Sequence, residues 1–216
     1  MNKIRGFEIV ERYRGKLPIL PILSTGGSAG HDFFALDDYY IYPTYTLEFV
    51  EQFGTKMDIK FHKPVIIPTG IKSYMLPDEY LAIENKSGLS TKYNLMFVNG
   101  RGIIDSDYYN CKGKDENDPC REGHIQLAFY NFSNEIVHIK KGQAIVQGIF
   151  HKYYKADGDN KDTIRNGGFG HTDNISIKGN SNIVFSNIKD ASEDFKELNI
   201  TREGNRIKLS NKWHIL

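Results

Sequence analysis

The residues Gly102-Ile-Ile-Asp105-Ser-Asp107-Tyr108-Tyr109 form a short apolar run that ends in two carboxylates and two aromatic rings. Alternate side chains of an extended strand lie on the same face, so Asp105 and Asp107 are expected on one side of the chain, with Tyr108 on the other face or at a turn. A carboxylate at a strand end, next to a flat aromatic surface, can act as a general base beside a ring or a sugar. The alternative is an ordinary turn, since Asp and Ser are common turn residues.

Four other stretches accompany this run in a fixed order along the chain. They are Ser28-Ala-Gly-His-Asp32-Phe, Lys86-Ser87-Gly88-Leu89, Gly142-Gln-Ala-Ile-Val-Gln147 and Arg165-Asn-Gly-Gly-Phe169-Gly170. With these five motifs in order, residues 16 to 173 resemble the trimeric dUTPases (deoxyuridine triphosphate nucleotidohydrolases). The branch from Gram-positive bacteria and their phages is most similar, because its central Asp-Tyr-Tyr-Asn and following Gly-His-Ile are both present. The resemblance implies an enzyme that hydrolyses dUTP to dUMP and pyrophosphate.

Short β-type segments fill the first 154 residues, with turn signals roughly every 8 to 12 residues, which indicates an all-β sandwich or barrel. No long stretch of this part keeps an apolar period of 3.6 residues, and one short helix is expected over residues 88–93. The resemblance implies a jelly-roll-like β barrel of the dUTPase type. Three parts are therefore predicted: a β-barrel domain over 1–154, a linker and glycine-rich lid arm over 155–173, and a C-terminal extension over 174–216.

The extension lies beyond the point where the family normally ends, and its role cannot be deduced from the sequence. A strand is expected over residues 182–186 and a helix over 190–198, since apolar positions recur there at helical spacing. A hairpin is expected around Arg202-Glu-Gly-Asn205.

Composition excludes several classes of function. The chain has 216 residues, of which 39% are hydrophobic and 25% are charged, and its formal net charge is +1. This balance is typical of a globular protein, and the lack of basic excess argues against nucleic-acid binding. No apolar run approaches the roughly 20 residues that span a bilayer, and the first residues lack the apolar stretch of a secretory signal. A cytoplasmic protein that binds no membrane is expected.

The two cysteines, Cys111 and Cys120, bracket a polar loop of eight residues. A metal site usually needs four ligands at close spacing, and no second pair of Cys or His lies nearby in the sequence. A disulfide across the loop is an alternative, but a cytoplasmic location favours free thiols.

The resemblance assigns the catalytic steps to three residues. Asp105 is expected to take a proton from the water that attacks the α-phosphorus of dUTP. Gln147 is expected to order a phosphate oxygen or that water. Asp32 is expected to contact Mg²⁺ through water, with the ion held mainly by the triphosphate, because Mg²⁺ keeps several of its waters. From the residues alone, Asp32 is better explained as a turn carboxylate, and Gln147 equally well as a satisfied core glutamine.

The remaining site residues follow from the resemblance as substrate contacts. Lys86 and Arg165 are expected to neutralise the outer phosphates, and Lys86 stands where the family usually has an arginine. A lysine supplies a point charge and cannot form the planar, bidentate contact of an arginine. The base, the sugar and the other phosphate oxygens are assigned to Ser87, Gly88, Asn99, Gly102, Ile104, Tyr108, Phe169, Gly170, His171 and Thr172.

Tyr108 is expected beneath the deoxyribose, where its ring leaves no room for a 2′-hydroxyl group, and Phe169 is expected to cover the base. The glycine-rich arm around Phe169 suits a mobile lid, although a plain flexible linker has the same composition. Because each site in the family draws motifs from three subunits, a homotrimer with shared sites is implied.

Two other classes of function remain open at this level. The dCTP deaminases share the fold, but they carry a glutamate in the central region and lack this Asp-Ser-Asp-Tyr-Tyr pattern. The second alternative is a regulatory protein partner, since phage relatives bind such proteins. The loop 111–120 and the tail 173–216 are the candidate surfaces for that partner.

Overall fold

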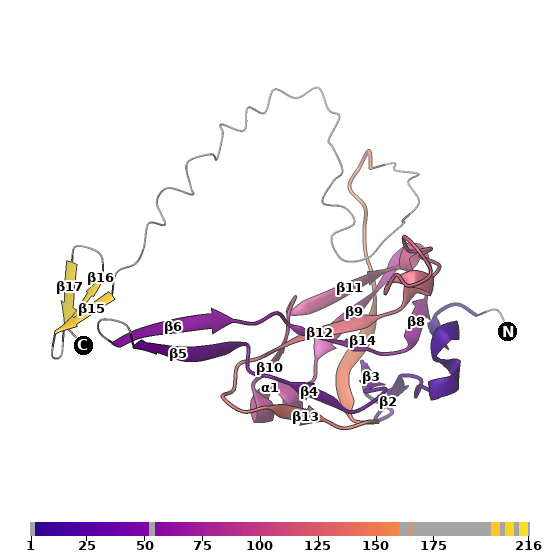
Figure 1. Cartoon of the computed structure of the whole chain (residues 1–216). Coiled ribbons are helices and arrows are strands. Elements are labelled where there is room, and N and C mark those ends of the chain that lie inside the picture. The colour runs from indigo at the N-terminus through magenta and orange to yellow at the C-terminus, as the bar shows by residue number, and fades with distance from the viewer. Residues whose placement is uncertain are drawn as a thin grey trace. The chain divides into compact units, whose positions relative to one another are not determined.

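The computed structural model describes residues 3–51, 55–159, 165, 200–203, 206–209 and 212–215 (Figure 1). The chain divides into two compact units, Met1–Asp173 and Asn174–Leu216. The larger unit carries all five sequence motifs, and antiparallel β-sheets make up most of it. The predicted all-β class is confirmed at this level.

The largest sheet of this unit has five strands in the order β11-β9-β14-β3-β2, and all neighbours run antiparallel. Its strands are β11 (Arg101–Asp105), β9 (Glu79–Asn85), β14 (Ala144–Lys152), β3 (His31–Phe34) and β2 (Ile22–Leu23). Three consecutive apolar residues of β9, Leu81 to Ile83, are buried, so this strand is covered on both of its faces. The short β2 lies at the sheet edge, as its two nearby prolines predict.

Smaller sheets and short helices complete the larger unit. The three-stranded sheet contains β10 (Leu95–Phe97), β12 (Gln126–Asn131) and β7 (Val65–Pro68). Two-stranded pairs are formed by β1 (Gly6–Ile9) with β8 (Ile71–Tyr74), β13 (Val137–Ile139) with β4 (Tyr39–Ile41), and β5 (Tyr45–Glu51) with β6 (Thr55–Phe61). The helices are α1 (Ser87–Tyr93) and the 3₁₀ helices η1 (Glu11–Lys16), η2 (Ser106–Tyr108) and η3 (Arg121–Gly123). The expected short helix is therefore present.

The core lies between these sheets and consists of aliphatic side chains and phenylalanine rings. Two glycines make the ring packing feasible. A Cβ atom on Gly148 would come within 2.7 Å of the Phe33 ring, and one on Gly102 would come within 2.9 Å of the Phe97 ring. Gly102 therefore has a packing role in addition to any role in substrate binding.

The smaller unit contains a three-stranded antiparallel sheet of β15 (Ile200–Glu203), β16 (Arg206–Leu209) and β17 (Lys212–Ile215). The hairpin expected around residues 202–205 is present, since Glu203 pairs with Arg206. The third strand was not expected from the sequence. The strand expected over 182–186 and the helix expected over 190–198 lie outside the described residues.

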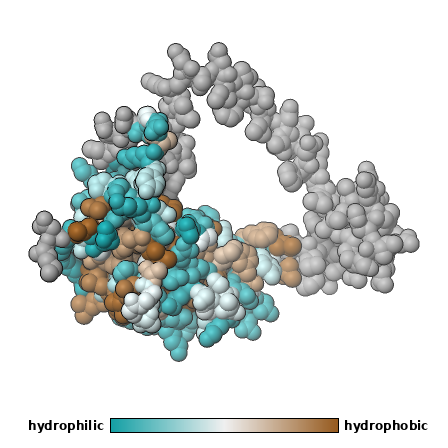
Figure 2. Space-filling view, turned by 180° about the vertical axis from the view of Figure 1, so that it is seen from behind, coloured by the Kyte–Doolittle hydropathy of each residue, from teal (hydrophilic) through white to brown (hydrophobic). Residues whose placement is uncertain are grey.

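Apolar side chains also occupy part of the surface of the larger unit, where brown areas interrupt the polar teal ones in Figure 2. Among the exposed apolar residues are Ile22 and Ile103 of the five-stranded sheet and Ile66 and Met96 of the three-stranded sheet. None of the helices in the described part of the chain is long and apolar enough to cross a membrane.

Candidate active site

Asp105 is the last residue of β11, opposite Tyr80 of β9, and the chain turns immediately afterwards into η2. Its carboxylate accepts a hydrogen bond from Nη2 of Arg165. Burial raises the pKa of Asp105 above its ordinary value, the positive charge of Arg165 lowers it, and the negative charge of Asp107 raises it. A carboxylate with a raised pKa at a strand end has the properties of a general base.

Arg165 lies between two carboxylates. Besides its bond to Asp105, it donates from Nε to Oδ1 of Asp107 at 2.9 Å, and its guanidinium carbon lies 5.9 Å from the centre of the Tyr108 ring. Asp105 and Asp107 thus converge on one cation, as their spacing predicted. Asp107 was not among the predicted site residues, although the Asp-Ser-Asp spacing could have identified it.

Tyr108 is buried, and its hydroxyl donates to the backbone oxygen of His124 at 3.0 Å. Burial raises the pKa of Tyr108, so the ring stays neutral. The ring packs against Cys111, Cys120 and Ile104, which fixes it beneath the Arg165 guanidinium.

His124 is a buried residue with a structural role. Its Nε2 accepts the backbone N–H of Gly70 at 3.0 Å, and its ring lies 4.7 Å from that of Tyr13. Burial, with a smaller contribution from the Arg12 charge, lowers the pKa of His124 to about 4. The imidazole therefore remains neutral near pH 7 and cannot serve there as a charged phosphate ligand.

A second group of predicted residues lies on the same face of the five-stranded sheet. Pairing places Asp32 of β3 beside Gln147 of β14, and Gln147 beside Glu84 of β9. Paired residues of neighbouring strands point to the same side, so these three form a polar row. Gln147 is half-buried in this row. The sequence had left open a core position for Gln147, and the structure does not place it there.

Asp32 is the anchor of this row. Its buried carboxylate accepts hydrogen bonds from Nζ of Lys86 at 2.7 and 2.8 Å and from the hydroxyl of Ser24. Burial opposes ionisation, but the bonds from Lys86 and Ser24 outweigh it and lower the pKa of Asp32. Ser24 was not predicted, because no local signal in its glycine-rich turn connects it to a carboxylate eight residues later.

Lys86 immediately precedes α1, and Ser87 and Gly88 form the first turn of that helix. Ser87 is exposed, and a Cβ atom placed on Gly88 would meet nothing within 4 Å. The space beside Gly88 is open to a ligand, and Lys86 is already oriented next to it by Asp32.

The two groups are not brought together within one chain. Asp105 is four residues along β11 from Arg101, and Arg101 pairs with Glu84, which stands in the row of Asp32 and Gln147. Four residues of a strand span about 13 Å, and the two strand spacings between Asp105 and β14 add about 10 Å sideways. The predicted base is therefore well beyond contact distance from the polar row of its own chain, although it contacts Arg165, the other predicted phosphate ligand.

The stretch predicted to read the base runs from the turn before β11 into the strand. Asn99 is exposed, and its backbone oxygen accepts the N–H of Arg101 at 2.6 Å, a tight turn in which Gly100 has a φ of 66°. Gly102 is buried and Ile104 is half-buried. The predicted contacts Phe169, Gly170, His171 and Thr172 lie outside the described residues.

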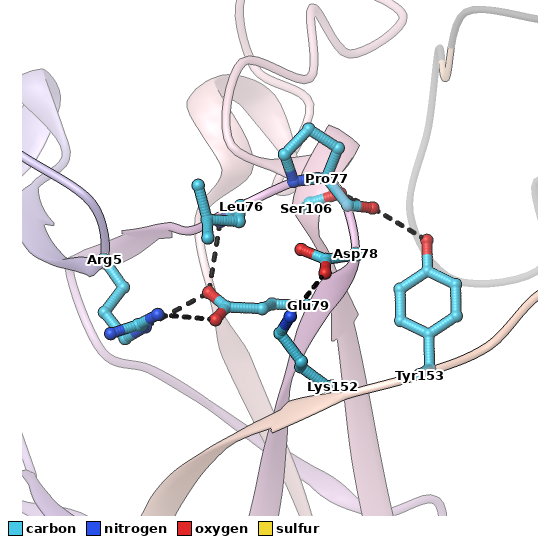
Figure 3. A network of polar contacts seen from close by, with 8 residues as sticks. All are labelled: Arg5, Leu76, Pro77, Asp78, Glu79, Ser106, Lys152 and Tyr153. Atoms are coloured by element: carbon cyan, nitrogen blue, oxygen red, sulfur yellow. Dashed lines mark hydrogen bonds and ion pairs between the residues drawn. The ribbon is translucent and has the colours of Figure 1, made fainter.

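A polar network braces the turn next to Asp105 (Figure 3). The guanidinium of Arg5 forms two hydrogen bonds with Glu79, at 2.6 and 3.1 Å, and the Glu79 carboxylate also accepts the backbone N–H of Leu76. Asp78 pairs with Lys152 at 3.0 Å, and the hydroxyl of Tyr153 donates to the backbone oxygen of Pro77. The turn that is tied in this way lies against Ser106, which separates Asp105 from Asp107.

The described residues contain no group of three or more His, Cys, Asp or Glu side chains that could hold a metal ion. The carboxylate of Asp32 is an oxygen ligand of the kind that Mg²⁺ prefers, but Lys86 and Ser24 already contact it. These residues are compatible with a Mg²⁺ ion that Asp32 contacts through water. They do not form a site in which protein ligands alone surround the ion.

The chain is similar to several known proteins in sequence and in structure. Over 172 residues it is 37% identical to the deoxyuridine 5′-triphosphate nucleotidohydrolase of Lactococcus lactis, which covers 79% of this chain and 98% of the relative. Its structure is similar to the crystal structure of the dUTPase from Streptococcus mutans, with 30% identity and a TM-score of 0.54 over 71% of this chain and 99% of that one.

A variant dUTPase of Staphylococcus aureus phage phi11, whose structure describes a coordinated structural Mg(II) ion, has a TM-score of 0.50 over 74% of this chain and 98% of that one. At 13% identity, this similarity concerns the fold alone. None of the protein-family models compared with the chain matches it.

Proposed function

This chain belongs to the deoxyuridine 5′-triphosphate nucleotidohydrolase (dUTPase) family and is a dUTP diphosphatase, and on that premise we propose how its residues hydrolyse dUTP to dUMP and pyrophosphate. Asp105 takes a proton from a water molecule, and the water oxygen attacks the α-phosphorus. The bond from the α-phosphorus to the bridging oxygen breaks, and pyrophosphate leaves. The raised pKa of Asp105 supports this role, because a partly buried carboxylate is a stronger base than an exposed one.

Arg165 has two positions in this proposal. Without substrate, it neutralises Asp105 and Asp107. When a triphosphate binds, the greater negative charge of the outer phosphates attracts the guanidinium, which suits bidentate contacts with phosphate. Its departure frees the carboxylate of Asp105 to accept the proton from water.

The polar row holds the triphosphate. Lys86, oriented by Asp32, contacts the outer phosphates, with Ser87 and Gly88 at the open start of α1. Gln147 orders a phosphate oxygen or the attacking water. Mg²⁺, when bound with the triphosphate, offsets the negative charge of the phosphate oxygens. Asp32 would contact the ion through water, because Lys86 and Ser24 already occupy the carboxylate oxygens of Asp32.

The nucleoside lies between the turn before β11 and the ring of Tyr108. The backbone of Asn99, Gly102 and Ile104 reads the uracil edge, and Tyr108 supports the deoxyribose and excludes a 2′-hydroxyl group. The arm over residues 155–173 closes the site as a lid, with Phe169 over the base and Gly170, His171 and Thr172 beside the phosphates. Residues 174–216 remain an extension of unassigned role.

The separation between Asp105 and the polar row is the observation that carries the proposal of a homotrimer. Because one chain keeps Asp105 about 13 Å along the sheet from the level of its own polar row, each site is completed by the polar row of a neighbouring chain. The exposed apolar residues Ile22, Ile103, Ile66 and Met96 supply surface that such an assembly would bury. Within each chain, residues 1–154 form the jelly-roll-like β barrel that the resemblance implies.

Replacing Asp105 by Asn tests the catalytic assignment. The amide keeps the size of the side chain and loses its basicity, so turnover should fall by roughly 10²- to 10⁴-fold while dUTP binding is mostly kept. Pyrophosphate release from dUTP, dCTP, dTTP and UTP measures activity and specificity, and calorimetry measures binding. Near-normal turnover in this variant would overturn the role of Asp105, and ammonia release from dCTP would indicate a deaminase instead.

A further inference from the structure

The two cysteines lie side by side although nine positions separate them. Their sulfur atoms are 3.5 Å apart, both side chains are buried, and both thiols are free. A disulfide requires a sulfur separation of about 2.0 Å, so closure needs a movement of about 1.5 Å.

The loop between the cysteines is held in the shape that brings them together. The carboxylate of Asp118 accepts the backbone N–H of Lys114 at 2.7 Å and that of Cys120 at 2.9 Å. From outside the loop, Arg12 donates to the backbone oxygen of Pro119 at 3.0 Å. A loop ordered in this way gives the thiols a high effective concentration, which favours an internal disulfide over a mixed one.

The thiol pair is also part of the packing around Tyr108. Both sulfurs pack against the same cluster as the Tyr108 ring, and the backbone N–H of Cys111 donates to the oxygen of Tyr108 at 3.0 Å. A bond between Cys111 and Cys120 would tie this turn to η3, where the oxygen of Cys111 already accepts the N–H of Glu122 at 2.7 Å.

We propose that Cys111 and Cys120 are a disulfide-forming site that locks the turn carrying Tyr108 when small-molecule disulfides such as oxidised glutathione are abundant. One protein thiolate attacks the small disulfide and releases one small thiolate. The second protein thiolate then attacks the protein-bound sulfur and releases the other. Two protein thiols are oxidised and one small disulfide is reduced to two thiols, so electrons and protons balance.

The reduced pair is protected from rapid reaction in the resting structure. Burial, together with hydrogen bonding to Asp118 and to Cys111, raises the pKa of Cys120 to about 12, so its thiolate is scarce near neutral pH. Exchange therefore proceeds when the polar loop of residues 112–119 opens, and it ends when the loop closes over the new bond.

The test uses the full-length protein treated with oxidised glutathione and then freed of reagent. Thiol titration under denaturing conditions should fall from two thiols per chain to none, and a non-reducing gel should show no cross-linked chains. Closing this short loop should raise the Tm by about 5–10 °C, and dithiothreitol should reverse the shift. Cys111→Ser and Cys120→Ser are the controls, since each keeps one thiol and can form only a mixed disulfide.

The coupling to Tyr108 rests on the proposed function and has its own measurement. If the ring supports the sugar, locking its turn should lower the KM for dUTP by about two-fold or more without changing kcat, because less ordering accompanies binding. An unchanged KM with the internal disulfide present would overturn the coupling alone. Two thiols that persist after treatment, a disulfide between chains, or an oxidised protein that melts no higher than the reduced one would overturn the site itself.

Discussion

The guanidinium of Arg165 is hydrogen-bonded to the carboxylate of Asp105, although 60 positions separate the two residues. Asp107 accepts a hydrogen bond from Nε of the same guanidinium at 2.9 Å. The proposed base is therefore paired with a cation that the phosphates of a substrate also attract. In the proposed mechanism, substrate binding drives the release of Arg165 from Asp105.

Replacing Asp107 by Asn should lower the pKa of Asp105, because the negative charge of Asp107 raises that pKa in the native protein. A base acts in its deprotonated form, so activity falls as the pH drops through its pKa. The acidic limb of kcat/KM should therefore move to lower pH in the variant. Asp38→Asn, which removes an exposed carboxylate that pairs with His138 outside the site, is the matched control. An acidic limb that does not move, or that moves to higher pH, contradicts the pairing.

Replacing Lys86 by Ala should weaken dUTP binding and also destabilise the fold. The change leaves the carboxylate of Asp32, which is 6% exposed, without its cation, and an unpaired buried group costs about 1–3 kcal/mol. Lys86→Arg should keep or improve affinity, because its fork can hold both Asp32 and phosphate. Calorimetry with dUTP and urea unfolding measure the two effects.

Lys92→Ala is the control for this substitution, since it removes an exposed lysine from the same helix. Combining Asp32→Asn with Lys86→Ala should recover part of the lost stability, because the orphaned charge is then absent. A Lys86→Ala protein that binds dUTP as tightly as the parent would show that this residue does not touch phosphate.

The ion pair of Glu79 with Arg5 should make stability depend on pH. The hydrogen bonds from Arg5 lower the pKa of Glu79 despite its burial. A carboxylate with a depressed pKa contributes stability above its unfolded value of about 4.3, and this contribution is lost as the pH falls through the folded pKa. Glu79→Gln should therefore lower the urea midpoint at neutral pH and flatten its decline in acid.

The neighbouring pair of Asp78 with Lys152 supplies the comparison for Glu79. Both of its side chains are more than half exposed, and exposed pairs contribute about 0–1 kcal/mol. Asp78→Asn should consequently change the midpoint far less than Glu79→Gln. Equal effects of the two substitutions would mean that the ion pair of the buried Glu79, drawn in Figure 3, contributes no more to stability than the exposed pair.

The sequence was informative where the signal is local. Residue type and spacing over a few positions predict the apolar run of β9, the short helix that ends at Tyr93 and the turn after Asp105. The five motifs added the site residues through their resemblance to one family. Both kinds of signal depend on residues that are close in sequence.

Contacts between distant segments could not be predicted. Arg5 and Glu79 are 74 positions apart, and either could have paired with many other exposed charges. The row of Asp32 and Gln147 depends on the register of three strands, and a shift by one residue would turn either side chain to the other face. The closeness of the two cysteine sulfurs depends on how Asp118 folds the loop between them.

The central claim is that each site combines Asp105 of one chain with the polar row of another. Subunit mixing tests this claim most directly. Asp105→Asn and Lys86→Ala chains, carrying different tags, are co-expressed, and the mixed assemblies are purified. In each mixed trimer about one site in three pairs an intact Asp105 with an intact Lys86 from a different chain. If the sites are shared, pyrophosphate release should be well above the average of the two parents. It should not exceed that average when Asp105→Asn chains are mixed with chains carrying both changes. Activity that stays at the average of the parents in the first mixture would contradict the shared site.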